Sequence, residues 1–215
     1  MQQMVVMNCR LCAAPKTEKV RGADERVYYL CPSCRLIGVA PQHFLSAHEE
    51  KARYLTHNNG IAHQGYVDFL RRAVIPALPF LKENMLGLDY GCGYAPTLSI
   101  LLAREGYRCD NYDPYFVSND LNATYDFIFS TEVFEHFRQP RRDIEKIVNL
   151  LRPEGILVVM TARWADLASF RNWYYTRDAS HVAFYHDKTF TYLCDEFGFQ
   201  NIFDDGQRIL LLRKI

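Results

Sequence analysis

Two Cys-x-x-Cys pairs near the start of the chain have the residue types and spacing of a metal site. Cys9 and Cys12 form the first pair, and Cys31 and Cys34 form the second. Two thiolates on one tight turn can reach a single tetrahedral Zn²⁺, and a second pair closes the shell without an open position. We therefore expect a structural zinc ribbon. Four metal-free structural cysteines are the alternative, and a redox pair is disfavoured because no strand-helix unit follows either pair.

A glycine-rich turn after an apolar segment is the second feature that could do chemistry. Residues 86–90 form this segment and include Asp89; Gly91 and Gly93 follow, and Pro96 then opens a helix. Glycines at these positions let the chain turn sharply after a strand and let a ligand approach bare backbone. Taken alone, the pattern also fits a plain strand-to-helix turn.

A second acid makes a nucleotide-type cofactor the better interpretation. The next expected strand, residues 107–112, is followed by Asp113. A carboxylate in that place can accept hydrogen bonds from two adjacent ribose hydroxyls. Ligands of open parallel sheets bind beyond the carboxyl ends of the strands, so Asp89, Asp113 and residues 131–132 should meet around one crevice.

The glycine turn and the segments after it resemble the class I S-adenosylmethionine-dependent methyltransferases. Residues 86–95 resemble that family's first strand and turn, residues 125–136 its fourth strand and the following loop, and residues 150–160 its fifth strand with the turn before it. The resemblance covers about residues 84–163. The front cysteines and residues 178–186 are similar to a subgroup that carries an N-terminal zinc ribbon.

The resemblance implies S-adenosylmethionine as the cofactor. Gly91 and Gly93 would approach its methionyl and ribose portions, Asp113 would take the ribose hydroxyls, and residues 131–133 would line the sulfonium side. The expected cofactor-binding set is Asp89, Gly91, Cys92, Gly93, Asp113, Pro114, Thr131, Glu132 and Val133. A short loop is expected to frame the adenine with Asn119, Asp120 and Leu121.

The residues expected to meet a methyl acceptor follow the fifth strand. Trp164 and residues 173–181 are aromatic, polar and weakly periodic, as in a loop over a pocket. An aromatic mini-core is the alternative. Within this stretch His181 is expected to face the acceptor, oriented by Asp178 or a nearby tyrosine, and to take a proton or a hydrogen bond. The expected catalytic residues are His181, Glu132 and Tyr185.

Other polar side chains have a structural interpretation. Glu135 and His136 have the residue types of an acid/base pair, but packing and hydrogen bonding at a helix start is favoured. Three histidines without a partner pattern are expected to be structural or exposed: His57, His63 and His186. Three cysteines outside the pairs are expected to be small core residues: Cys92, Cys109 and Cys194.

Composition excludes several classes of protein. The chain has 215 residues, of which 49% are hydrophobic and 23% charged, which is typical of a globular chain. Lys plus Arg and Asp plus Glu both number 25, so a general nucleic-acid binder is disfavoured. No apolar run has membrane-spanning length, and no export signal opens the sequence, so we expect no membrane partner and a cytoplasmic location. In a reducing cytosol the seven cysteines are thiols or metal ligands.

Local patterns predict the organisation of the chain. From residue 85 onward strands and helices alternate, which predicts an α/β, Rossmann-like doubly wound sheet. Residues 199–203 and 208–213 flank an Asp-Asp-Gly turn and predict a C-terminal antiparallel hairpin. The expected domains are a zinc ribbon over residues 1–42, a helical cover over residues 43–84 and a methyltransferase domain over residues 85–215.

Helix signals are present before and after the central sheet. Ser46 opens a capping box, which predicts a helix over residues 47–57. Residues 66–74 have helical periodicity that two following prolines disturb or end. Asp187 is expected to be the N-cap of a later helix that Gly198 closes.

Three functions remain open at this stage. The leading one is methyl transfer to a small-molecule acceptor. The second is a degenerate or non-catalytic cofactor-binding module acting through its zinc ribbon, against which the intact Asp89, Gly91, Gly93 and Asp113 argue. The third is an RNA methyltransferase. The first 40 residues carry six Lys or Arg and three Asp or Glu, and a four-thiolate zinc site adds about −2, so the ribbon is nearly neutral.

Overall fold

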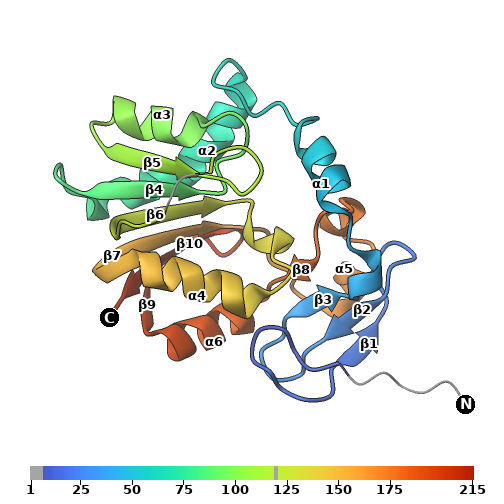
Figure 1. The fold of residues 1–215 in the computed structure, drawn as a ribbon. Coiled ribbons are helices and arrows are strands. Elements are labelled where there is room, and N and C mark those ends of the chain that lie inside the picture. Colours follow the sequence, from blue (N-terminus) through green and yellow to red (C-terminus); the bar gives the residue numbers. More distant parts are fainter. Residues whose placement is uncertain (1–6, 119–120) are drawn as a thin grey trace, which may run out of the picture.

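The computed structural model describes residues 7–118 and 121–215. Its centre is a six-stranded sheet in the order β5-β4-β6-β7-β10-β9 (Figure 1). The first four strands in this order are parallel, whereas β10 and β9 run antiparallel to their neighbours. The strands are β4 (Leu86–Tyr90), β5 (Arg108–Tyr112), β6 (Tyr125–Thr131), β7 (Leu151–Met160), β9 (Phe199–Asp204) and β10 (Ile209–Lys214). The predicted α/β sheet with a C-terminal antiparallel hairpin is confirmed.

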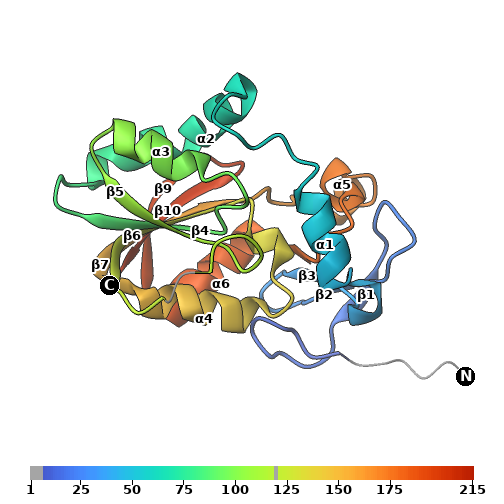
Figure 2. The same cartoon turned by 45° about the horizontal axis from the view of Figure 1, so that its top comes forward.

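Helices cover both faces of this sheet, because its central strands are apolar on both sides. On β6, Phe127 and Phe129 belong to the cluster that contains α2 and α3, and Ile128 belongs to the cluster that contains α4 and α6. Figure 2 shows the two pairs of helices on opposite sides of the sheet. The helices are α2 (Gln64–Ala77), α3 (Thr97–Arg104), α4 (Pro140–Leu150) and α6 (Asp187–Phe197).

The sheet has one strand fewer at its β5 edge than the resemblance implies. Residues 125–131 resemble the fourth strand of the family, whereas among the described residues two strands, β4 and β5, precede them in this sheet. β6 pairs directly with β4, and β5 is the edge strand. In the described residues between β5 and β6 there is no further strand of this sheet. A parallel crossover alone takes a dozen or more residues, so residues 113–124 are too few for a crossover and a strand.

A second, smaller sheet joins the N-terminal segment to the rest of the molecule. Its order is β1-β2-β3-β8, and its strands are β1 (Glu18–Val20), β2 (Tyr28–Leu30), β3 (Ile37–Val39) and β8 (Ala183–Phe184). Ile37 on β3 lies opposite Phe184 on β8. Tyr28, Phe170 and Phe184 form an aromatic cluster over this sheet with edge-to-face and tilted contacts. The cysteine-bearing segment and residues 161–186 therefore share one core.

Helix α1 (Ala47–Tyr54) lies beside the small sheet and not within the layers (Figure 1). The predicted capping box is present: Ser46 Oγ accepts from the Glu49 amide, and the Glu49 carboxylate accepts from the Ser46 amide. Shorter helices are η1 (Pro41–His43), η2 (Leu78–Phe80), η3 (Phe134–His136), α5 (Leu167–Phe170) and η4 (Tyr174–Arg177). Within the described ranges, no helix combines the length and the apolarity needed to cross a bilayer.

The N-cap of α6 differs from the prediction by one residue. His186 is the cap, and Asp187 is the first helical residue. The His186 ring accepts the Lys188 amide at 3.0 Å, and Thr189 Oγ1 accepts the His186 amide at 3.1 Å. This reciprocal pair does the work of a Ser/Glu capping box. Gly198 closes the helix in the left-handed conformation, as predicted.

Candidate functional site

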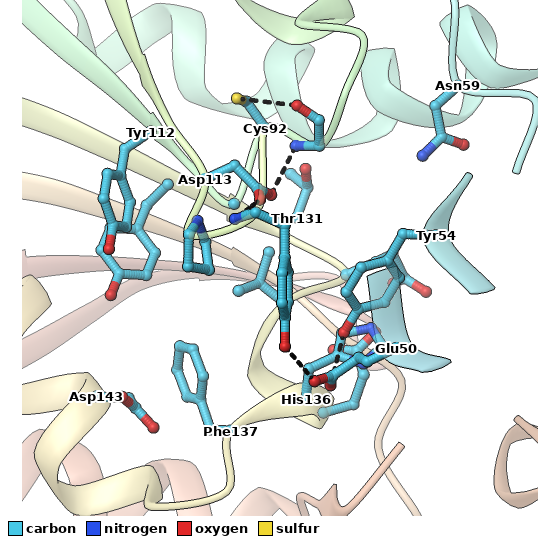
Figure 3. Close-up of a pocket in the computed structure, with 18 of the residues that line it drawn as sticks. Glu50, Tyr54, Asn59, Cys92, Tyr112, Asp113, Thr131, His136, Phe137 and Asp143 are labelled. Carbon is cyan, nitrogen blue, oxygen red and sulfur yellow. Dashed lines mark hydrogen bonds between the residues drawn. The ribbon is translucent and has the colours of Figure 1, made fainter. Parts of the chain in front are cut away.

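A cavity of about 620 Å³ opens at the carboxyl ends of β4, β5 and β6 (Figure 3). Its lining comes from the glycine turn after β4, the loop after β5, the segment after β6, and the α1–α2 region. Its size is within the range of sites that bind small molecules. Of the expected cofactor-binding residues, all except Asp89 line it: Gly91, Cys92, Gly93, Asp113, Pro114, Thr131, Glu132 and Val133.

The turn after β4 is held by its own backbone and by the end of β5. The amides of Gly91 and Cys92 both donate to the carbonyl of Tyr112, at 2.7 and 3.1 Å. Gly91 has a φ of 90°, and a Cβ there would lie 2.4 Å from Val133 Cγ2. Neither the conformation nor the space permits a side chain at Gly91. Backbone therefore forms this wall of the cavity.

Asp113 fastens the glycine turn to the loop after β5. Its two carboxylate oxygens accept from the amides of Gly93 at 3.0 Å and Tyr115 at 2.8 Å. Each oxygen can accept a further hydrogen bond, and Asp113 lines the cavity. The carboxylate is thus fixed in place and can accept from a vicinal diol.

Asp89 lies beneath the turn, almost fully buried at 2% exposure. Its Oδ1 is buried without a hydrogen-bond partner among the described residues. Burial first, and the nearby Asp113 second, raise the pKa of Asp89 to about 8. A buried carboxylate with an unused oxygen suits a ligand that brings a cation or a donor to it.

Asp89 should make the stability of the ligand-free protein depend on pH. Its raised pKa means that the folded state keeps a proton up to about pH 8, whereas the unfolded chain loses it near pH 4, so the free energy of unfolding falls as pH rises between these values. Asp89→Asn cannot ionise. Its melting temperature minus that of the wild type should increase between about pH 5 and pH 8 in scanning calorimetry. Parallel pH profiles for the two proteins would contradict this account.

The expected catalytic residue Glu132 follows β6 with a φ of 54°. Arg208 donates to both of its carboxylate oxygens, at 2.9 and 3.0 Å, and the hydroxyl of Tyr175 donates to one of them at 3.2 Å. The same hydroxyl also lies at hydrogen-bond distance from the buried carboxylate of Glu135, so its single hydrogen is shared between the two acids. Because these bonds hold the carboxylate of Glu132 in place, the geometry favours a role for this residue in positioning the groups around it.

His181 and His136 meet at one end of the cavity with ring centroids 4.9 Å apart. Nδ1 of His181 lies 2.7 Å from the carbonyl oxygen of Tyr175, and Nδ1 of His136 lies 3.1 Å from that of Ser180. Of the two expected partners, the nearby tyrosine orients the His181 ring, through the backbone carbonyl of Tyr175 and its ring at 4.3 Å, and Asp178 does not bond that ring. Burial is the largest cause that lowers both pKa values, that of His181 to about 3. Both rings are therefore neutral near pH 7 and suited to accept hydrogen bonds.

Tyr185 is placed differently from His181. Its side chain is fully buried, and its hydroxyl donates to the carbonyl of Phe134 at 3.1 Å. It is absent from the cavity lining and packs instead against the rings of Phe134 and Phe190. We therefore leave Tyr185 out of the proposed acceptor site.

The stretch expected to cover the pocket mainly packs in the aromatic cluster. Trp164, Trp173 and Tyr175 surround Phe170 and Phe184. From residues 164–181, only His181 lines the cavity. The aromatic core that the sequence leaves as an alternative is thus formed.

Cavity residues that sequence reasoning did not single out come from residues 43–84, from tyrosines near the ends of β4 and β5, and from residues 137–146. Glu50 is 5% exposed and accepts from the hydroxyls of Tyr54 at 2.9 Å and Tyr115 at 2.6 Å. Arg138 donates to it at 2.8 Å. Figure 3 shows Glu50 and Tyr54 beside His136. The sequence around Glu50 and Tyr54 predicts a helix but not its position over the cavity. The available signal was the expectation that residues 43–84 form a helical cover.

Several remaining predictions concern residues near the ends of the sheet. Asn119 and Asp120 lie outside the described residues, and Leu121 does not line the cavity. Asp126 lies near the start of β6, at the end away from the site, and accepts from the Leu86 amide and from Arg152. His63 precedes α2, and His57 lines the cavity.

The four N-terminal cysteine sulfurs lie within 4.8 Å of one another. Sγ of Cys9 is 3.6 Å from Sγ of Cys34, and Sγ of Cys12 is 3.4 Å from Sγ of Cys31. Zn–S bonds of about 2.3 Å in a tetrahedron place sulfurs about 3.8 Å apart, so the cluster has nearly the size that zinc requires. Each pair ends in a tight turn with a left-handed residue, Ala13 or Arg35.

The family model of a methyltransferase domain matches residues 61–202 of the chain. That range includes β4, β5, β6 and the turn that lines the cavity. The chain belongs to the class I S-adenosylmethionine-dependent methyltransferases. No curated protein sequence matches it.

Solved structures of methyltransferases share this fold. A chain from the complex of the Haloferax volcanii Trm112 methyltransferase activator with a methyltransferase has a TM-score of 0.57 at 15% identity, covering 77% of this chain and 97% of that one. Magnesium protoporphyrin IX methyltransferase from Synechocystis PCC 6803, with bound SAH, gives 0.56 at 16% identity, covering 81% and 97%. A SAM-dependent methyltransferase from Archaeoglobus fulgidus gives 0.51 at 15% identity, covering 68% and 94%.

The site of this methyltransferase fits the cofactor of its family. Gly91 presents bare backbone to the cavity, Asp113 presents two fixed carboxylate oxygens, and Asp89 holds a buried oxygen that has no partner in the described part of the chain. The bare backbone at Gly91 permits a close approach of the cofactor, and the carboxylate of Asp113 suits its ribose diol. The buried oxygen of Asp89 suits its positively charged methionyl amine. Burial raises the pKa of the Cys92 thiol to about 12, so it lines the site as a neutral side chain.

Proposed function

We propose that this methyltransferase transfers a methyl group from S-adenosylmethionine to a small-molecule acceptor bound between the segment after β6 and helix α1. The observation that carries the proposal is the enclosure of this end of the cavity. Tyr54 contacts the His136 ring edge-on at 5.2 Å, and the His181 ring lies 4.9 Å from the same ring. Such a buried recess suits a small molecule better than a polymer.

In this proposal the protein aligns two molecules and excludes water. The cofactor supplies an activated methyl group on a sulfonium. Asp113 fixes the ribose, Asp89 faces the methionyl amine, and Thr131 to Val133 line the side of the sulfonium. The neutral rings of His136 and His181 accept a hydrogen bond from the acceptor and set its reacting atom in line.

For the cysteine cluster we propose one structural zinc ion bound by Cys9, Cys12, Cys31 and Cys34. Four thiolates leave no position for an activated water, so this ion does not take part in transfer. It would instead hold the turn of Cys9 and Cys12 against the turn of Cys31 and Cys34, which joins β2 to β3. Because β3 pairs with β8, the zinc also stabilises the segment that carries His181.

The small-molecule proposal can be tested with S-adenosylmethionine labelled in its methyl group. We expect the purified protein, incubated with a bacterial cell extract, to move label into the fraction below about 1 kDa, the size class that fits the cavity. Asp113→Ala is the matched inactive control. Label that appears only in RNA or protein would contradict the small-molecule assignment.

His181→Ala should separate acceptor handling from cofactor binding. The ring lies at the acceptor end, and its hydrogen bond and ring contacts in the described part of the chain are to Tyr175 and His136 and not to the glycine turn. Affinity for S-adenosylhomocysteine should therefore change less than twofold, which is within about 0.4 kcal/mol. Label transfer should fall by about 10²-fold or more if the ring positions or deprotonates the acceptor. Unchanged transfer with an unchanged melting temperature would remove His181 from the acceptor site.

A further inference from the structure

Three side chains at the acceptor end carry the donor set of a metal site. Glu135, His136 and His181 each offer one ligand atom, and these atoms lie within 4.8 Å of one another. All three residues line the cavity, in which Figure 3 shows His136 beneath Glu50 and Tyr54. From this arrangement we propose that the three residues bind a divalent first-row transition metal ion, separate from the four cysteines.

Both histidine rings are held in the tautomer that a metal ligand needs. Nδ1 of His136 meets the Ser180 carbonyl, and Nδ1 of His181 meets the Tyr175 carbonyl. A carbonyl only accepts, so each Nδ1 carries the hydrogen and each Nε2 keeps its lone pair. Among the described residues no group bonds either Nε2. Histidines that bind metals usually donate their other nitrogen in this way, which fixes the ring.

Glu135 adds a buried carboxyl group that has no basic partner among the described residues. It is fully buried, and it accepts from Thr161 Oγ1 at 2.8 Å and from the hydroxyl of Tyr175. In the described part of the chain, no basic side chain lies at ion-pair distance from it. Arg208 is paired with Glu132. Since burying an unpaired carboxylate is costly, a divalent cation at its open side would stabilise the folded protein.

The dimensions suit binding after small side-chain shifts. Metal–ligand bonds of about 2.0–2.1 Å place ligand atoms about 3.3 Å apart in a tetrahedron, so the group must contract by about 1.5 Å at its widest. Two imidazoles and one carboxylate favour zinc, iron, manganese or cobalt over calcium or magnesium. At least one coordination position would remain open toward the cavity. If the proposed methyl transfer holds, the ion would occupy the Nε2 lone pairs of both rings, so an acceptor oxygen would bind the ion in place of the rings and become a better nucleophile.

Metal content per chain tests this site without any activity assay. We expect the full-length protein, saturated with Zn²⁺ and desalted, to hold two ions per chain by elemental analysis. His136→Asn and His181→Asn should each retain one ion, bound by the cysteines. His57→Asn is the matched control, because His57 lines the same cavity outside the group of three, and it should retain two.

Cobalt distinguishes the two sites even if one histidine variant fails to fold. Co²⁺ bound by thiolates gives sulfur charge-transfer bands, whereas Co²⁺ on nitrogen and oxygen ligands gives weaker visible bands alone. The wild type should show both sets, and His181→Asn should lose only the second. One zinc per wild-type chain after saturation, or a second ion that both histidine variants retain, would overturn the proposal. Cofactor binding measured by calorimetry is independent of this result, so failure of the metal site and failure of the proposed function are distinguishable.

Discussion

Replacement of Cys31 by serine is expected to release the proposed zinc ion and unfold the small β1-β2-β3 sheet. Structural zinc binding contributes about 10–16 kcal/mol to the folding of small zinc domains, which is comparable to the total stability of a typical domain. The strands of this sheet are three residues each and could not remain paired without the two cysteine turns. Elemental analysis and hydrogen exchange would measure the two effects.

The shared core predicts how far the unfolding spreads. Because Phe184 pairs with Ile37 and packs on Tyr28, exchange protection should also fall over residues 161–186. The site for S-adenosylhomocysteine should survive, since the glycine turn belongs to the six-stranded sheet. Cys194→Ser, outside the cluster, is the control and should keep its zinc. Full zinc content in a Cys9/Cys31 double variant would refute the assignment.

Asp113→Ala is expected to weaken binding of both S-adenosylmethionine and its demethylated product. Hydrogen bonds to a charged group contribute about 1.5–3 kcal/mol, which corresponds to a tenfold to hundredfold loss of affinity. The substitution also removes the acceptors for the Gly93 and Tyr115 amides, so the loss should lie at or above the upper end of this range. Asp195→Ala, an exposed acid on α6, should bind like the wild type. An affinity for Asp113→Ala within threefold of wild type would remove this residue from the site.

The parts of the site that depend on local chemistry could be predicted from the sequence. A strand, a glycine turn and an acid that follows a strand are each defined by a few consecutive residues. The parallel sheet then brings the ends of neighbouring strands together. Gly91, Asp113 and Val133 illustrate this, because all three lie where the strand ends converge. The four cysteines are the same case, since their spacing alone defines two turns.

The parts that depend on long-range packing could not be predicted in this way. Glu50 and Tyr54 have no local signature that places them over the cavity, because helix α1 is positioned by contacts with residues far along the chain, such as Arg138. The pairing of β8 with β3 is of the same kind. Residues 183–184 are too few to give a strand pattern. The sequence therefore does not show that the ribbon shares a core with residues 161–186.

Calorimetric titration of the wild-type chain with S-adenosylhomocysteine tests the central claim most directly, because it needs no acceptor. We predict one binding site per chain and an affinity that Asp113→Ala lowers at least tenfold. Absence of binding to S-adenosylhomocysteine and S-adenosylmethionine by the folded protein, together with binding of a nicotinamide dinucleotide, would contradict the account.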